Sequence, residues 1–284
     1  MKGHNQIGKL VLASAGPGDP ELVTLKTVRR LQEADVVLVD RLVSPEILAA
    51  HVRPETEIVY VGKQCRRGIS TPQPTINELI VFYAKQGKAV LRLKGGDVSI
   101  FSNILDELET AKQHNIPYEI IPGVTAALGA AACAGIPLTA RGYSTAVRFL
   151  TLYKNDIVSE DYWKELAATD DTLVFYMSSE TLDTVVHKLT AYGIADSKLL
   201  AVAEQATTAL QRVYTCSLYD YSNTLQQVSF ISPSLVIIGK VVALHEQFSW
   251  IDNAKASAFY FQPLTAKVAE ISANEKAAKY VSRA

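Results

Sequence analysis

The chain has 284 residues, a length that fits two domains better than one compact core. Lysine and arginine number 28 against 29 aspartate and glutamate, so the sequence lacks the overall positive charge that nucleic-acid binding usually requires. The three cysteines and five histidines are scattered without metal-binding spacing, which indicates a reducing compartment and no structural metal.

No segment resembles a signal peptide or a membrane span. Residues 1–6 are polar, and the longest apolar stretch, 124–138, contains two glycines and a proline and falls short of the roughly 20 residues that a span needs. We therefore expect a soluble cytoplasmic protein that binds neither membrane nor nucleic acid.

Apolar and β-branched runs alternate with amphipathic segments through the first half of the chain. Most of the runs are apolar on both faces, as strands of a buried parallel sheet are, so the pattern predicts an α/β fold. The predicted strands are 10–14, 36–39, 58–61, 89–93 and 118–121, and the predicted helices are 21–33, 76–86 and 99–114.

After Pro137 the pattern restarts with different spacing. No helix separates the last two predicted strands, which indicates some antiparallel pairing in a second α/β domain. The predicted strands are 147–152, 172–177, 199–204, 211–217 and 235–242, with helices at 161–168 and 180–192. We expect domains at 1–138 and 139–248, followed by a tail at 249–284 that is either disordered or contains a marginal surface helix at 265–280.

Unusual residues collect where the strands of the first domain end. GPGDP at 16–20 follows the first strand, Asp40 and Arg41 the second, Gly62 and Lys63 the third, and KGGD at 94–97 the fourth. Ligands of open parallel sheets bind outside the carboxyl ends of the strands. All four motifs are therefore predicted to face one crevice.

Neither of the common phosphate-binding patterns is present. The third glycine of a dinucleotide motif is replaced by Glu21, Pro17 removes a backbone donor, and no Walker sequence occurs. Asp19 and Pro20 are explained as a helix start. The second glycine motif is open to two interpretations: a turn after which Asp97 or Ser99 caps the next helix, or a turn that admits a ligand.

In that order along the chain, the motifs GPGDPELVTLK, VLVDRLVSPEIL, VLRLKGGD, IPGVTAALGAAACAGIPLT and PSLVIIGKVV resemble the uroporphyrinogen-III C-methyltransferases of the tetrapyrrole methylase family. The likeness covers residues 9–244. It implies two α/β domains with the active site in the cleft between them, in a homodimer. It also implies methylation of uroporphyrinogen III at C-2 and C-7 to precorrin-2, a step shared by sirohaem and cobalamin synthesis.

The resemblance assigns roles to particular positions. Asp40 corresponds to the proton acceptor and Lys63 to the proton donor, while Arg41, Lys94 and Arg141 are expected to bind the carboxylates of the tetrapyrrole substrate. The expected contacts of S-adenosylmethionine, which is released as S-adenosylhomocysteine, are Pro17, Gly95, Gly96, Asp97, Ile100, Thr125, Ala126, Met177 and Ala206. Because this cofactor carries no phosphate, glycine turns and a carboxylate suit it.

The sequence departs from the family pattern mainly on the substrate side. Asn103 stands where the family has an arginine, Ala140 replaces a histidine, and Ala206 often corresponds to a glycine. Two alternatives therefore remain open: a methylase of a later corrinoid precursor, and a protein that binds the cofactor or a tetrapyrrole without catalysis.

Overall fold

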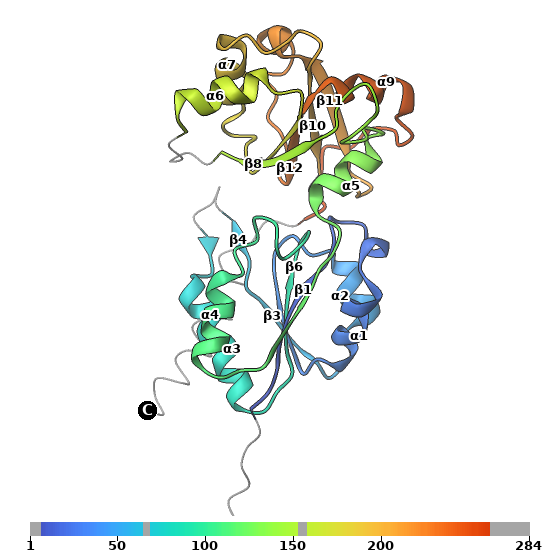
Figure 1. Ribbon diagram of the computed structural model, residues 1–284. Coiled ribbons are helices and arrows are strands. Elements are labelled where there is room, and N and C mark those ends of the chain that lie inside the picture. The colour runs from blue at the N-terminus through green and yellow to red at the C-terminus, as the bar shows by residue number, and fades with distance from the viewer. Residues whose placement is uncertain (1–6, 65–68, 153–157, 262–284) are drawn as a thin grey trace, which may run out of the picture. The chain divides into compact units, whose positions relative to one another are not determined.

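A computed structural model describes residues 7–64, 69–152 and 158–261 of the chain (Figure 1). The internal contacts divide these residues into two units: the first ends at Thr125 and includes Phe261, and the second spans Ala126–Tyr260. The division falls before the boundary expected at residue 138, because helix α5 (Ala126–Cys133) contacts strand β12 (Ser234–Gly239) of the second sheet.

The first unit is built on a five-stranded sheet in the order β3-β2-β6-β1-β7, in which every neighbouring pair is parallel. Residues 10–14, 36–39 and 118–121 form strands with the predicted bounds. The strands are β1 (Leu10–Ser14), β2 (Val36–Val39), β3 (Glu57–Tyr60), β6 (Val90–Lys94) and β7 (Tyr118–Ile121), and a separate antiparallel pair is formed by β4 (Lys63–Gln64) and β5 (Ile69–Ser70).

Two helices cover each face of this sheet (Figure 1). Because side chains alternate along a strand, Leu10 and Leu12 pack toward α3 and α4, while Val11 and Ala13 pack toward α1 and α2. The helices are η1 (Pro20–Leu22), α1 (Leu25–Glu33), α2 (Pro45–His51), α3 (Gln73–Lys85) and α4 (Leu105–Gln113).

Helix starts follow local capping chemistry. The Asp19 carboxylate accepts a hydrogen bond from the Glu21 amide at 2.9 Å, with Pro20 at the first helical position, as predicted. The segment predicted as one helix at 21–33 is divided, because the Thr24 hydroxyl caps a new helix by accepting from the Thr27 amide at 3.2 Å.

The second unit contains a mixed sheet in the order β11-β10-β12-β9-β8. Only β8 and β9 are a parallel pair, so the predicted antiparallel pairing and the α/β fold class are both confirmed. The strands are β8 (Val147–Thr151), β9 (Thr172–Tyr176), β10 (Leu199–Glu204), β11 (Arg212–Ser217) and β12 (Ser234–Gly239).

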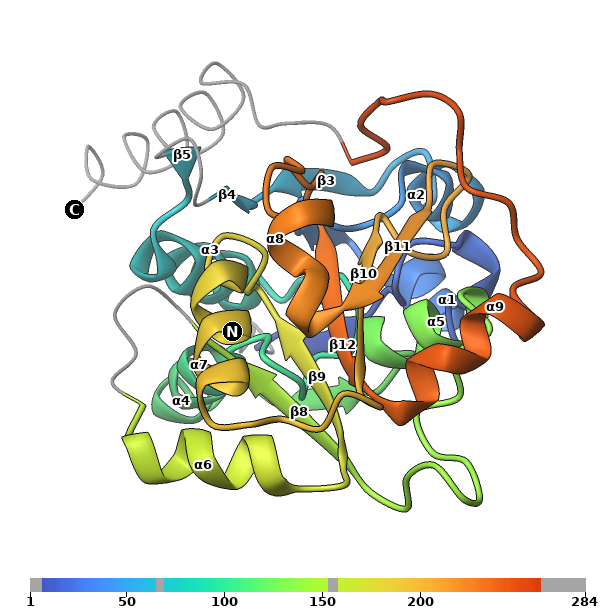
Figure 2. The ribbon, with the colours of Figure 1, turned by 90° about the horizontal axis from the view of Figure 1, so that it is seen from above.

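Helices also cover this second sheet. Figure 2 shows α6 and α7 on one side of β10 and β12, with α5 and α9 on the other. Side chains of α6 and α7 share a buried cluster with Leu200, Val202 and Val236. The helices that follow α5 are α6 (Glu160–Ala168), α7 (Leu182–Ala191), η3 (Leu218–Asp220), α8 (Tyr221–Thr224), η4 (Lys240–Ala243) and α9 (Leu244–Phe248).

The segment after α9 is bonded to the second unit rather than extending from it. The Asn253 side-chain amide forms two hydrogen bonds with the backbone of Val213, at 2.6 and 2.9 Å, on strand β11. The Trp250 indole donates to the Ala132 carbonyl at 2.8 Å. The helix considered for 265–280 lies outside the described residues, so the prediction for that part of the tail stays open.

Close packing of loops at the carboxyl edge of the first sheet leaves no room for a side chain at Gly123. A Cβ atom there would lie 2.5 Å from the Cβ of Ser14 at the end of β1. Gly239, at the end of β12, is different, because its nearest neighbour would be the Thr172 hydroxyl at 3.4 Å.

We predict that Gly123→Ala lowers the free energy of unfolding by about 1–3 kcal/mol, because the β1 and β7 ends must separate to accept the methyl group. Denaturant unfolding measures this change. Gly239→Ala is the matched control and should cost clearly less. Equal stability of Gly123→Ala and the unsubstituted chain would contradict the packing described for this edge.

Candidate active site

The carboxyl ends of β1 and β6 are neighbours at the centre of the first sheet. The chain leaves β1 toward α1 on one face and leaves β6 toward α4 on the opposite face (Figure 1). Strand order therefore reverses between these two strands, and ligands of open α/β sheets bind outside such a point. The motifs that were predicted to share a crevice all follow strands at this carboxyl edge of the sheet.

The two glycine turns are bonded directly to each other. The Gly96 amide donates to the Gly16 carbonyl at 2.7 Å, and the Gly16 amide donates to the Gly96 carbonyl at 3.2 Å. Both residues have positive φ, 80° for Gly16 and 69° for Gly96, which glycine adopts without steric cost. The turns after β1 and β6 thus form one unit that brings Pro17 next to the second motif.

Asp97 is bonded to the backbone on both of its oxygens. One oxygen accepts from the Ser99 amide at 2.8 Å and the other from the Gly123 amide at 2.7 Å. Because α4 begins only at Leu105, Asp97 is not a helix cap, and the predicted helix at 99–114 starts late. Phe101 and Asn103 have positive φ, which interrupts a helix there.

Gly95 is required by the protein itself. A Cβ atom on this residue would lie 2.5 Å from the carbonyl oxygen of Leu42, in the loop after β2. From the sequence, Gly95 was expected to contact the cofactor. The structure provides a reason for the glycine within the protein, because the loops after β2 and β6 touch at Gly95.

Asp40 follows β2, and its side chain is partly open, with 27% of its surface exposed. Its backbone amide donates to the Leu93 carbonyl at 2.9 Å, and its Oδ1 accepts from the Arg41 amide at 3.0 Å. These bonds fix the residue at the strand end. Lys63 begins β4 shortly after β3, and its side chain lies outside the described part of the structure.

Lys94 does not have the open position expected of a substrate ligand. Its ammonium group is buried and donates to both oxygens of Glu107, at 3.1 and 3.2 Å. Burial lowers the pKa of the Lys94 side chain, and the positive charge of nearby Arg92 lowers it further, against the raising effect of Glu107.

Sequence reasoning missed Arg92 and Glu107. Arg92 lies within the β6 run that was interpreted as an apolar strand, and its side chain is 3% exposed. Glu107 is fully buried on the inward stripe of α4 that also contains Thr110 and Ala111. A charge inside an apolar strand, and a carboxylate on the inward stripe of a helix, are the sequence signals that point to such a pair.

The other predicted contacts of the first unit are distributed along its loops. Pro17 and Ile100 are half-buried in the turns after β1 and β6, and Thr125 is buried after β7. Asp40 and Asp97 are acidic, and Pro17 and Ile100 are apolar. This chemistry suits a cationic molecule without phosphate groups.

In the second unit, Met177 and Ala206 follow β9 and β10. Both strands are antiparallel to β12, so they run in the same direction and their carboxyl ends lie at the same edge of the sheet. Met177 is exposed and has a φ of 54°, and Thr207, next to Ala206, has a φ of 69°. Positive φ at non-glycine residues often accompanies functional loops. Ala126 begins α5, and Arg141 is exposed in the turn before β8.

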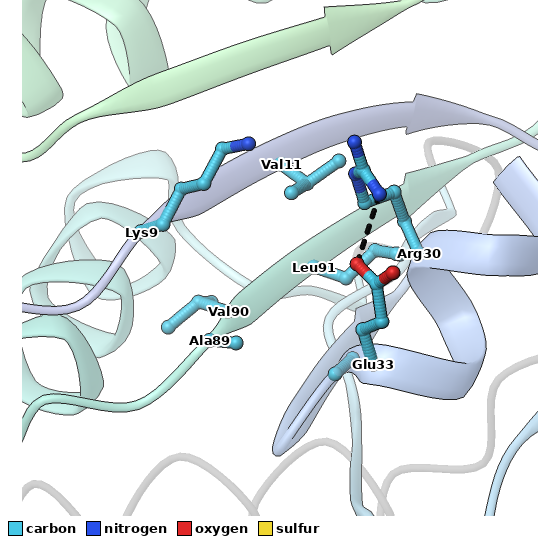
Figure 3. A pocket seen from close by; sticks show the side chains of 8 residues that line it. Lys9, Val11, Arg30, Glu33, Ala89, Val90 and Leu91 are labelled. Atoms are coloured by element: carbon cyan, nitrogen blue, oxygen red, sulfur yellow. Dashed lines mark hydrogen bonds and ion pairs between the residues drawn. The ribbon is translucent and has the colours of Figure 1, made fainter. Parts of the chain in front are cut away.

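A hollow of about 240 Å³ lies at the opposite, amino end of the first sheet (Figure 3). Val11, Val90 and Leu91 form its apolar part, and Lys9 and Arg30 extend over it. Lys9, Lys26 and Arg30 all contact the carboxylate of Glu119, and their hydrogen bonds hold the pKa of Glu119 well below its usual range. These cations are thus paired with a carboxylate of the protein itself, and no predicted site residue lines the hollow.

A metal-binding cluster and a membrane-spanning helix are both absent from the described residues. Within 7–64, 69–152 and 158–261, no three metal-binding side chains come together. No helix in the same ranges combines the length and hydropathy needed to cross a bilayer.

Comparison with known proteins gives one consistent family. The family model for Tetrapyrrole (Corrin/Porphyrin) Methylases matches residues 9–221. The siroheme synthase of Stutzerimonas stutzeri is 44% identical over 251 residues, which is 88% of this chain and 54% of the relative. A siroheme synthase of Pseudomonas putida is 45% identical over 252 residues, with 89% and 54% covered. The chain spans about half the length of the curated relatives it matches.

Solved structures give the same result. The uroporphyrin-III C-methyltransferase of Thermus thermophilus matches with a TM-score of 0.71 and 32% identity over 86% of this chain and 98% of that one. A structure of the Thermus thermophilus enzyme with bound S-adenosylhomocysteine matches with a TM-score of 0.69 and 33% identity, over 83% and 93%. The strand order and the motifs at the carboxyl edge agree with these comparisons. The chain belongs to the tetrapyrrole methylase family.

Proposed function

We propose that the chain is a methyltransferase that uses S-adenosylmethionine to methylate uroporphyrinogen III at C-2 and C-7, giving precorrin-2. The observation that carries the proposal is the carboxyl edge of the first sheet. There Asp40, the paired turns at Gly16 and Gly96, and Asp97 are held by backbone hydrogen bonds. Likeness to the Thermus thermophilus methyltransferase, 32% identical, supports the choice of substrate.

The residues at this edge suit such a reaction. S-adenosylmethionine supplies a methyl group on a cationic sulfur, and S-adenosylhomocysteine is the neutral product. Asp40 accepts the proton that the substrate loses as its pyrrole carbon gains the methyl group, and Lys63 acts as proton donor. Both contacts of the Asp40 carboxylate within the described chain use Oδ1, which leaves Oδ2 for that proton.

The cofactor contacts that we propose are those implied by the family pattern. Asp97 already accepts two backbone hydrogen bonds, so a cofactor hydroxyl or ammonium would use a further lone pair of its oxygens. Gly96 similarly has its amide and carbonyl bonded to Gly16. The full proposed set is Pro17, Gly95, Gly96, Asp97, Ile100, Thr125, Ala126, Met177 and Ala206.

A substrate with eight carboxylates needs cations, and the net charge of the chain is only -1. Arg41 and Arg141 are the ligands we propose for substrate carboxylates. The bond between Lys94 and Glu107 supports a different role for Lys94, which neutralises a buried carboxylate beneath the site. We further propose that the protein acts in the cytoplasm as a homodimer, as the family pattern implies.

The reaction itself is tested by an anaerobic incubation of the chain with uroporphyrinogen III and methyl-labelled S-adenosylmethionine. Mass spectrometry should find two labelled methyl groups in the tetrapyrrole and an equal amount of S-adenosylhomocysteine. Binding of the cofactor without any methyl transfer would reject the proposal in favour of a non-catalytic binding protein.

We predict that Asp40→Asn lowers kcat by about 10²- to 10⁴-fold, because the amide cannot accept the substrate proton. Calorimetry should find the dissociation constant of S-adenosylhomocysteine within about threefold of the original value. The control is Asp252→Asn, at an exposed position after α9, which should leave both values unchanged. Full activity of Asp40→Asn would remove Asp40 from the mechanism.

A second candidate function is methylation of a later corrinoid precursor. The observation in its favour is Asn103, whose side-chain amide donates to Asp106 at 3.1 Å and so carries no cation toward a substrate. Parallel assays with uroporphyrinogen III and with precorrin-2 separate the two candidates. Turnover of precorrin-2 alone would select the second.

A further inference from the structure

Four charged side chains lie together under the carboxyl end of the first sheet, on the face covered by α3 and α4. They are Asp40 after β2, Arg92 and Lys94 on β6, and Glu107 on α4. Arg92, Lys94 and Glu107 are almost completely buried, whereas Asp40 is the partly open member. The set contains two positive and two negative groups, and the motifs of the sequence account for Asp40 and Lys94 alone.

The guanidinium of Arg92 is fixed by hydrogen bonds in several directions. Its Nε donates to Glu107 at 3.4 Å, and its Nη1 donates to the carbonyls of Leu38 and Leu93 at 3.2 and 3.1 Å. With these groups in place, Nη2 lies 4.0 Å from Oδ1 of Asp40. This distance is too long for a hydrogen bond, so the interaction between Arg92 and Asp40 is electrostatic.

Arg92 and Asp40 are also tied to a common backbone group. The Leu93 carbonyl accepts both the Nη1 hydrogen of Arg92 and the backbone amide of Asp40, at 3.1 and 2.9 Å. A displacement of one residue therefore disturbs the other. The guanidinium faces the side of the Asp40 carboxylate that is already bonded to Arg41.

A buried network of charges is a poor means of gaining stability. The cost of removing the groups from water is comparable to what their attraction returns, and apolar side chains of similar size often stabilise a fold as well or better. The network is better explained by its location, since it ends at the carboxylate proposed as the base.

We propose that Arg92 and Glu107 are positioning residues for Asp40. Arg92 orients the Asp40 carboxylate in its ionised form, and Glu107 offsets the charges of Arg92 and Lys94. The proposal rests on the proposed function in one respect, the role of Asp40 as base. Glu107 lies within ion-pair distance of both cations, so the charge next to the Asp40 carboxylate is balanced.

Within the described side chains, the charged groups around Asp40 come from three elements. Arg41 follows it in its own loop, Arg92 and Lys94 face it from β6, and Glu107 lies behind them on α4. Lys63 starts β4, and its side chain is outside the described structure. Substitutions at Arg92 and Glu107 thus change the surrounding charge in opposite directions without altering Asp40.

The experiment follows Asp40 itself by ¹³C NMR of its carboxyl carbon, assigned by the loss of its signal in Asp40→Asn. Arg92→Met should raise the midpoint of the Asp40 titration, because a neighbouring positive charge is lost. Glu107→Gln should lower the midpoint, because an anion is lost. The acidic limb of the pH profile of kcat should move in the same two directions.

Arg92→Met should also lower kcat by on the order of 10- to 100-fold, since the base is misplaced, with the cofactor dissociation constant unchanged. Arg92→Lys keeps the charge but loses the planar group, so it should restore the midpoint and leave kcat reduced. It also serves if Arg92→Met does not fold. Glu57→Gln is the control, because Glu57 on β3 is bonded to Tyr83 and should leave Asp40 unaffected.

Unchanged midpoints in both variants, or shifts of the same sign, would overturn the positioning role and leave a purely structural network. Failure of the proposed function has a separate signature. If the unsubstituted chain binds S-adenosylmethionine and transfers no methyl group, the function is rejected, while the NMR titration still decides whether Arg92 and Glu107 control Asp40.

Discussion

Two buried side chains, Ser14 and Asp97, hold together the loops that leave three neighbouring strands. The Ser14 hydroxyl donates to the Ile121 carbonyl at 2.9 Å and accepts from the Val98 amide at 3.0 Å, so it joins the ends of β1, β7 and β6. Asp97 joins the β6 turn to the β7 loop through the Gly123 amide. Beyond the ends of parallel strands, no regular backbone hydrogen bonds align these loops. Hydrogen bonds from side chains to the backbone align them instead.

This constraint changes the meaning of the glycines. Gly95 and Gly123 have no room for a side chain, because protein atoms occupy the space that it would need. Gly96 is hydrogen-bonded to Gly16. The loops are thereby brought close enough to form one surface before any ligand arrives. A rigid surface of this kind lowers the entropy cost of binding and orients a bound molecule, which favours transfer reactions that depend on alignment.

The order of strands and helices in the first unit was largely readable from the sequence, because buried parallel strands leave long apolar runs. The loop at 98–104 was not, since helical periodicity continues through Phe101 and Asn103 while their positive φ ends the helix. The position of Asp40 directly after β2 could be predicted, because a motif marks that strand end. The burial of Lys94 could not be predicted, because its pairing depends on Glu107, which only the fold brings near.

We propose that the carboxyl edge of the first sheet binds the methyl donor. A crystal structure of the chain grown with S-adenosylhomocysteine tests this most directly. We predict density for the product against the turns at Pro17 and Gly96, with Asp97 in contact. Density at the hollow beneath Lys9 and Arg30, with the carboxyl edge empty at saturating concentration, would contradict it.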